Sequence, residues 1–183
     1  MFILPRFFIN RMRLQLKDVF SLANGLSGFF ALPLFFLVGY FPAAAMVLLA
    51  LVFDFLDGKV ARKSRGDDEF GKQLDSLADA VSFGAVPPFL LLSFHSLYSY
   101  SPNGGFWVFY PLLLGGLFFL GACLIRLALF NVQKEKGVYH GLPSPLAAAL
   151  AVVFGWLNPY VGIILLFVLG AAMLSKFKLK KVF

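Results

Sequence analysis

The chain has 183 residues, of which 60% are hydrophobic and only 14% charged, and phenylalanine alone occupies 24 positions. This composition lies far from the average of soluble domains and excludes an ordinary water-soluble protein. The formal net charge is +7, but no basic module with interleaved aromatic residues accompanies it. We therefore expect anionic membrane lipids as partners and no nucleic acid. A single cysteine, Cys123, excludes an internal disulfide.

The first 18 residues are basic and amphipathic. Arg6, Asn10, Arg13 and Lys17 recur at helical spacing, and apolar residues occupy another face. This pattern predicts a helix over residues 1–18 that lies in the headgroup region of a membrane. A basic topology signal without defined structure is the alternative interpretation.

Six apolar segments follow. A membrane-spanning helix needs roughly 17 to 25 mostly apolar residues. We predict one all-α membrane domain over 1–183, with six transmembrane helices between 19 and 176 and a basic tail at 177–183. The expected spans are 19–39, 42–63, 72–96, 106–130, 142–157 and 159–176. The last two are short, and Asn158-Pro159 is the reason for dividing them.

Positive charge lies at only one set of span ends. It occurs in residues 6–17, in the 63–72 loop, at Lys134 and Lys136, and in the tail, whereas the ends near 40, 97–105 and 158 carry no charge. The positive-inside rule then places both termini in the cytoplasm, in the cell (inner) membrane.

Four aspartates stand at the cytoplasmic ends of the second and third spans. Asp54 and Asp57 are three residues apart, and Asp75 and Asp79 are four apart, so each pair shares one helix face. The loop between the two helices is short, which favours antiparallel neighbours. We expect all four carboxylates to converge.

Carboxylates in a membrane are costly, at roughly 2.5–3.5 kcal/mol each on insertion scales at mid-membrane. A divalent cation offsets both this cost and their mutual repulsion, and an all-oxygen ligand set favours Mg²⁺ or Mn²⁺ over zinc. The alternative is a set of surface carboxylates paired with Lys59, Arg62 or Lys72.

Small residues continue the face of Asp54. Gly58 and Ala61 follow it at helical spacing, so little side-chain bulk lies beside the expected metal site. A nucleotide or diphosphate fits against such a backbone. The alternative for Gly58 is close packing between helices.

The acidic residues belong to a longer motif, Asp54-x2-Asp57-Gly58-x2-Ala61-Arg62-x8-Gly71-x3-Asp75-x3-Asp79. It resembles the signature of the CDP-alcohol phosphotransferases, membrane enzymes that make phospholipids from CDP-linked precursors. "DSLADAVSFGAVPP" from Asp75, "RLALFN" from Arg126 and "GLPSPLAAA" from Gly141 are similar to the phosphatidylserine synthase branch. "FSLANGLSGFFA" resembles that branch's T-x-x-N-x-x-x-G pattern, with Ser21 at the usual threonine position.

This resemblance implies a reaction in which L-serine attacks the β-phosphorus of CDP-diacylglycerol, or of an archaeal CDP-lipid, and releases CMP. Asp54, Asp57 and Asp75 would hold a pair of Mg²⁺ or Mn²⁺ ions on the diphosphate. Asp79 would complete the metal site and act as general base on the serine hydroxyl. The set expected to bind the CDP-linked substrate comprises Gly58, Ala61, Arg62, Gly71 and Asn24.

Arg126 is the expected site for the carboxylate of serine, because it is embedded near the cytoplasmic end of an apolar span. Asn131 is expected as a further polar contact in the serine-binding set. The alternatives are snorkelling of Arg126 toward the headgroups and helix capping by Asn131 and Asn24. The branch often has a second arginine where this chain has Leu129. This difference argues against a second cationic side chain at that position and leaves Arg126 as the principal candidate for binding the carboxylate.

Two other functions compete with serine transfer. A transferase of the same family that uses glycerol 3-phosphate or inositol phosphate would require more cationic side chains. A cation transporter is the distant alternative, and no polar route across the bilayer supports it. We also expect a homodimer.

Overall fold

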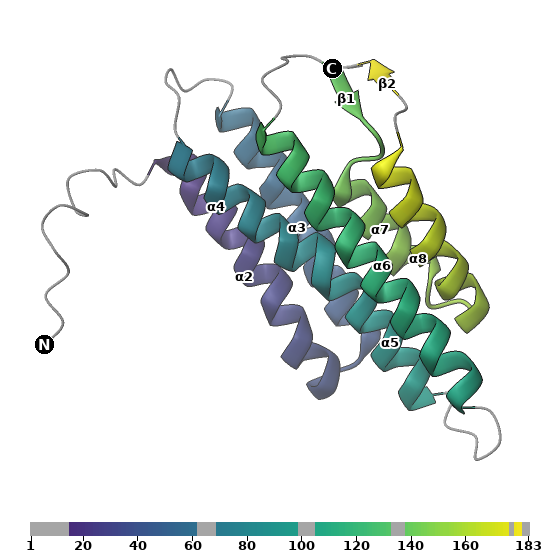
Figure 1. Ribbon diagram of the computed structural model, residues 1–183. Helices are drawn as coiled ribbons and strands as arrows, with labels where there is room; N and C mark the ends of the chain where they lie inside the picture. The colour runs from purple at the N-terminus through teal and green to yellow at the C-terminus, as the bar shows by residue number, and fades with distance from the viewer. Residues whose placement is uncertain (1–14, 62–68, 99–104, 133–137, 176–177, 181–183) are drawn as a thin grey trace, which may run out of the picture.

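The computed structural model describes residues 15–61, 69–98, 105–132, 138–175 and 178–180. Long helices run side by side in one bundle, and a two-stranded β-ribbon lies at one end (Figure 1). The elements are α2 (Leu16–Leu37), α3 (Tyr40–Ala61), α4 (Glu69–Asp79), the π-helix η1 (Ala80–Ala85), α5 (Val86–Tyr98), α6 (Gly105–Val132), β1 (Val138–His140), α7 (Ser144–Phe154), α8 (Pro159–Leu174) and β2 (Lys178–Lys180). Apart from the ribbon, the predicted all-helical membrane architecture is confirmed.

Four helical stretches are long and apolar enough to cross a membrane. They are Leu16–Leu37, Tyr40–Val60, Glu69–Ser96 and Trp107–Val132. α7 and α8 contain 11 and 16 residues, which is fewer than the roughly 17 that a span needs. The predicted count of six spans therefore stays a prediction for the last two segments.

The first spanning helix begins earlier than expected. α2 starts at Leu16, and the backbone N–H of Gln15 donates to Oδ2 of Asp18 over 2.8 Å, in a capping box that fixes this start. Residues 16–18 of the expected interfacial helix therefore belong to the first span. The rest of that prediction falls on residues 1–14, outside the described residues.

Turn residues explain the breaks between neighbouring helices. Gly39 joins α2 to α3 with a φ of +117°, a conformation that favours glycine. Pro42 is accommodated in the first turn of α3, so the second span starts at Tyr40 rather than at 42. Asn158 caps α8, since its side chain accepts from the backbone N–H of Tyr160 over 2.9 Å. The expected division at Asn158-Pro159 is confirmed.

The third span contains a π-helix that the sequence analysis did not predict. α4, η1 and α5 follow one another without a break, and the N–H of Val86 donates to the carbonyl of Val81, five residues earlier. Pro87 and Pro88 come directly after, and a proline ring clashes with the carbonyl four residues before it. The wider π turn accommodates these prolines within a continuous helix.

Small side chains bring the helices together. α2 packs against α3 and α4, and α6 packs against α5 and α8. Ala147, Ala148 and Ala151 are fully buried, which lets α7 lie close to its neighbours. The hydroxyl of Tyr40 donates to the carbonyl of Val152 over 2.8 Å and links α3 to α7.

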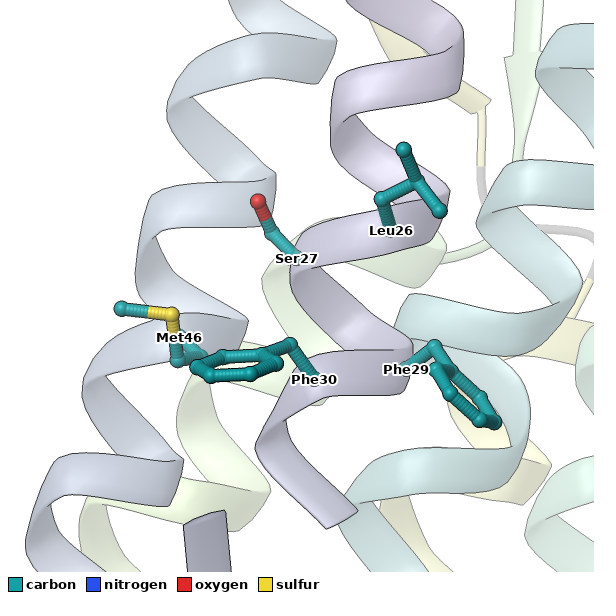
Figure 2. A pocket seen from close by; sticks show the side chains of 5 residues that line it. All are labelled: Leu26, Ser27, Phe29, Phe30 and Met46. Atoms are coloured by element: carbon teal, nitrogen blue, oxygen red, sulfur yellow. The ribbon is translucent and has the colours of Figure 1, made fainter. Parts of the chain in front are cut away.

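The outer surface of the bundle is apolar. One example is a shallow hollow between α2 and α3 (Figure 2). The hollow is lined by Leu26, Ser27, Phe29, Phe30 and Met46. Leu26 and Phe29 are 59% and 60% exposed, and such exposure of large apolar residues suits lipid rather than water.

Charge is confined to one end of the bundle, which we call the aspartate end. It is the end where α2 begins, α3 ends and α4 begins. Among the described residues, every Asp, Glu, Lys and Arg lies toward this end or on β2. The predicted asymmetry of charge is therefore present in the described residues.

Candidate functional site

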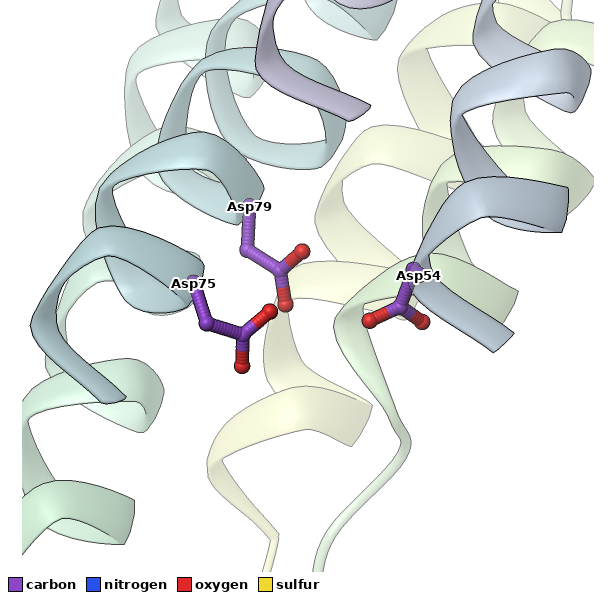
Figure 3. Close-up of side chains that lie close together, drawn as sticks. All are labelled: Asp54, Asp75 and Asp79. Carbon is purple, nitrogen blue, oxygen red and sulfur yellow. The ribbon is translucent and has the colours of Figure 1, made fainter. Parts of the chain in front are cut away.

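Three carboxylates meet at the aspartate end. Asp54 comes from α3, and Asp75 and Asp79 come from successive turns of α4, and their carboxylates turn toward a common region (Figure 3). One carboxylate oxygen from each residue lies within 4.8 Å of the other two. The expected convergence of the two acidic helices is therefore present for these three residues.

Asp57 lies beside this group and contacts a different helix. It is buried and accepts a hydrogen bond from the hydroxyl of Ser21 on α2. Its carboxyl group also faces that of Asp75. Asp57 thus lies next to the other three carboxylates, and its own hydrogen bond comes from Ser21 on α2.

Two cations compensate part of this negative charge. Arg126 on α6 interacts electrostatically with Asp54 and Asp79, and Lys17 at the start of α2 interacts with Asp57 and Asp75. Among the described residues, these two cations face the four carboxylates of the cluster, and Asp18 adds a further carboxylate near Asp57. A buried acidic cluster of this kind requires further positive charge.

The donor set fits a hard divalent cation. The closest ligands are carboxylate oxygens of Asp54, Asp75 and Asp79, and the described part of the chain places no histidine or cysteine among them. Oxygen-only ligand sets are typical of Mg²⁺ and Mn²⁺. The arrangement is therefore a candidate metal centre with Asp57 next to it.

Asn24 holds the most enclosed of the four aspartates. Asp79 is only 7% exposed, and its Oδ1 accepts a hydrogen bond from Nδ2 of Asn24 over 2.9 Å. The hydroxyl of Ser82, one turn further along the same span, donates to the backbone carbonyl of Asn24 over 2.9 Å. Asn24 therefore contacts the acidic helix directly, and its expected contact with substrate stays a prediction.

Arg126 is positioned by the start of α7. Its Nη1 donates to the hydroxyl oxygen of Ser144 over 2.8 Å, and Ser144 is fully buried. Asn131, expected in the same serine-binding set as Arg126, is exposed and exchanges hydrogen bonds with Ser76 on α4 at 2.9 and 3.2 Å. The structure thus gives the two expected serine-binding residues separate partners.

Open space lies beside Asp54 on α3. Among the described residues, a Cβ added at Gly58 would meet no atom within 4 Å, so close packing against another described helix does not explain this glycine. Gly71 is buried at the start of α4. Ala61 ends α3 without a described side chain, and Arg62 lies outside the described residues.

Three serines near the site were not among the predicted site residues. Ser21 contacts Asp57, Ser82 contacts Asn24, and Ser144 contacts Arg126. Ser21 and Asn24 are three residues apart in an apolar span, so they share a face, and this spacing was a usable signal. Nothing local marks Ser82 or Ser144, because their partners lie far away in the sequence.

The fold and this centre define a class: a helical membrane protein with an acidic, metal-compatible site at one end of its bundle. The family model for CDP-alcohol phosphatidyltransferase matches residues 14–176. The chain therefore belongs to the CDP-alcohol phosphatidyltransferase family. All four aspartates of the motif, together with Arg126 and Ser144, fall within the matched region.

Curated relatives are similar over much of the chain. A CDP-diacylglycerol–serine O-phosphatidyltransferase of Methanocaldococcus jannaschii is 33% identical over 92% of this chain and 75% of its own length. An archaetidylserine synthase of Methanothermobacter thermautotrophicus is 37% identical over 74% of this chain and 55% of its own length. A CDP-diacylglycerol–serine O-phosphatidyltransferase of Bacillus subtilis is 29% identical over 86% of this chain and 85% of its own length. The match thus spans from about half to most of these relatives.

Proposed function

We propose that the protein transfers the phosphatidyl group of CDP-diacylglycerol, or of the corresponding archaeal CDP-lipid, to the hydroxyl of L-serine. The observation that carries this proposal is the meeting of Asp54, Asp75 and Asp79 at one end of an apolar bundle, within electrostatic reach of Arg126. Family membership supports a CDP-linked substrate, and the names of the relatives support serine as the acceptor. The products are phosphatidylserine, or its archaeal counterpart, and CMP.

In this reaction, the serine hydroxyl oxygen forms a bond to the β-phosphorus of the CDP-lipid, and the bond from that phosphorus to the CMP oxygen breaks. The hydroxyl proton passes to the carboxylate of Asp79, and the displaced oxygen leaves on CMP. The burial of Asp79 and its hydrogen bond from Asn24 support this role, because they hold the base in one orientation away from bulk water.

Asp54, Asp57, Asp75 and Asp79 would together hold Mg²⁺ or Mn²⁺, in our proposal as a pair of ions. The gathering of carboxylates and the oxygen-only donor set among the described residues support this assignment. A bound divalent ion would neutralise charge on the diphosphate and on the leaving oxygen. The chain's own contribution is to hold the four carboxylates together despite their repulsion, through Ser21, Asn24, Lys17 and Arg126.

Arg126 is proposed to bind the carboxylate of serine. Its guanidinium is held by Ser144 close to Asp54 and Asp79, and the planar guanidinium group matches the geometry of a carboxylate. The free space at Gly58 supports a place for the CDP group against α3. Ala61, Arg62 and Gly71 belong to the same proposed surface, and Asn131 stays a prediction as a serine contact.

We further infer that the aspartate end faces the cytoplasm, where CMP and serine are found. The confinement of described charges to this end supports the orientation. Both termini would then be cytoplasmic. The homodimer also stays a prediction.

The test is CMP release by the purified protein in lipid nanodiscs that contain CDP-diacylglycerol or CDP-archaeol, with Mg²⁺ or Mn²⁺ present. L-serine, ethanolamine, glycerol 3-phosphate and inositol phosphate are compared as acceptors. We expect release to depend on serine and to be weak with ethanolamine, which lacks the carboxylate. Faster release with glycerol 3-phosphate or inositol phosphate would assign the chain to that other acceptor class.

A further inference from the structure

Helix α2 contributes none of the three clustered carboxylates of Asp54, Asp75 and Asp79, yet its side chains form hydrogen bonds with both helices that carry them. Ser21 donates to Asp57 on α3, and Asn24 donates to Asp79 on α4. Both donors are buried, with Ser21 1% exposed and Asn24 fully enclosed. Since they are three residues apart, they extend from one face of α2 toward two different helices.

The contact between α2 and the third span is unusually close. A Cβ at Gly28 would lie 2.6 Å from the backbone Cα of Ser82, so only glycine fits at this point. One turn back along α2, the hydroxyl of Ser82 donates to the carbonyl of Asn24. Asn24 is therefore fixed through its backbone by η1 and bonded through its side chain to Asp79.

The side chain of Asn24 is not fully satisfied in this position. Its Nδ2 donates to Asp79, but its buried Oδ1 finds no hydrogen-bond partner among the described residues. A buried acceptor without a partner lowers stability. An apolar residue would avoid that cost, so the orientation of Asp79 is the better explanation for an amide here.

We propose that Asn24 is a positioning residue for Asp79, and that Ser21 has the same relation to Asp57. The amide N–H of Asn24 fixes one oxygen of Asp79 and leaves the second available to the site. The proposal rests on the function proposed above only in taking Asp79 as a reactive or metal-binding group. In this proposal, Asn24 acts by orienting Asp79 and not by binding the substrate itself.

The first test compares Asn24→Leu with Asn24→Ala. Asn24→Leu keeps a side chain of similar size without adding charge and removes the N–H donor, so it separates positioning from packing. Loss of residues that orient metal ligands typically lowers metal affinity or activity about 10- to 100-fold. We expect a loss of that size in kcat, with the KM for the CDP-lipid changed by less than about threefold. Mn²⁺ binding without substrate, followed by electron paramagnetic resonance of the free ion, should weaken in both variants.

The second test uses Ser21, whose conservative variant retains the hydroxyl. Ser21→Ala should weaken Mn²⁺ binding and lower kcat, and Ser21→Thr should restore both. Ser27→Ala is the matched control, because Ser27 lies on the same helix but lines the apolar hollow of Figure 2. Tyr40→Phe removes a buried hydrogen bond at the opposite end of α3. Both controls should leave kcat and Mn²⁺ binding unchanged, even if Tyr40→Phe lowers the melting temperature.

A raised KM for the CDP-lipid with unchanged kcat in the Asn24 variants would assign Asn24 to the substrate and overturn the proposal. Unchanged Mn²⁺ binding and kcat in a folded Asn24→Leu or Ser21→Ala protein would overturn it as well. The Mn²⁺ measurement needs no acceptor, and kcat is measured with whichever alcohol supports CMP release. Failure of serine as acceptor is therefore distinguishable from failure of the positioning role.

Discussion

Nη1 of Arg126 donates a hydrogen bond to the hydroxyl oxygen of Ser144, with 2.8 Å between the two atoms. Arg126 lies six residues before the end of α6, and Ser144 is the first residue of α7. The bond holds a half-buried guanidinium near Asp54 and Asp79, with which it interacts electrostatically. The start of α7 therefore helps to determine where the guanidinium of Arg126 lies.

We expect Arg126→Ala to raise the KM for serine about ten- to a hundredfold, since a hydrogen bond to a charged group contributes roughly 1.5–3 kcal/mol. The KM for the CDP-lipid should stay nearly unchanged. Ser144→Ala should act in the same direction but more weakly, because Arg126 retains its charge. Both values come from CMP release at varied serine concentration.

Lys59→Ala is the control for the loss of a cation at the same end of the bundle. Lys59 is exposed, and its ammonium nitrogen lies 4.4 Å from the ring centroid of Phe55. Its removal should leave the serine KM unchanged. An unchanged serine KM in Arg126→Ala as well would refute the assignment of the carboxylate to Arg126.

Gly58→Ala tests whether substrate occupies the space beside Asp54. The described part of the chain offers no atom within 4 Å of the added methyl group, and alanine favours a helix over glycine by about 0.8–1.0 kcal/mol. Stability should therefore not fall. If the CDP group lies there, overpacking of about 1–3 kcal/mol should raise the KM for the CDP-lipid about five- to a hundredfold.

Gly121→Ala is the matched control, since a Cβ at Gly121 on α6 also meets nothing within 4 Å. Thermal unfolding and CMP release are measured for both variants. An equal, small effect of the two substitutions would place the CDP group elsewhere.

Chelation by EDTA should abolish CMP release, and Mg²⁺ or Mn²⁺ should restore it. Asp54→Asn, Asp57→Asn and Asp75→Asn should each lower both turnover and Mn²⁺ affinity, because each removes a charged oxygen ligand or its neighbour. Glu69→Gln, which changes an exposed carboxylate at the start of α4, is the control. Undiminished turnover in EDTA would contradict a metal-dependent mechanism.

Accessibility labelling in intact cells tests the orientation. Tags at both termini and in the 63–70 loop should be reached only after the membrane is permeabilised, whereas a tag near Asn103 should be reached from outside. The reason is the gathering of Lys and Arg at the aspartate end. Labelling of the 63–70 tag in intact cells would reverse the proposed placement of the site.

Much of the acidic centre could be predicted from the local spacing of the aspartates in the sequence. An α-helix places residues three or four positions apart on one face, so the spacing of Asp75 and Asp79 predicted a shared face without any tertiary information. The short segment between α3 and α4 predicted that Asp54 lies opposite. Helix periodicity and a short loop are both local properties, and the structure bears out the convergence of these three residues.

The surroundings of that centre depended on contacts between distant segments. Ser21 meets Asp57 across 36 positions, and Asn24 meets Asp79 across 55. The periodicity of α2 predicts that Ser21 and Asn24 share a face, but it does not predict which helices that face contacts. Those contacts depend on the close approach of α2 to the third span, which Gly28 permits. The sequence by itself determined the apolar spans, the charged end and the faces of the aspartates. The tertiary structure decided which side chains hold those aspartates and Arg126, because helix packing alone brings them within hydrogen-bonding distance.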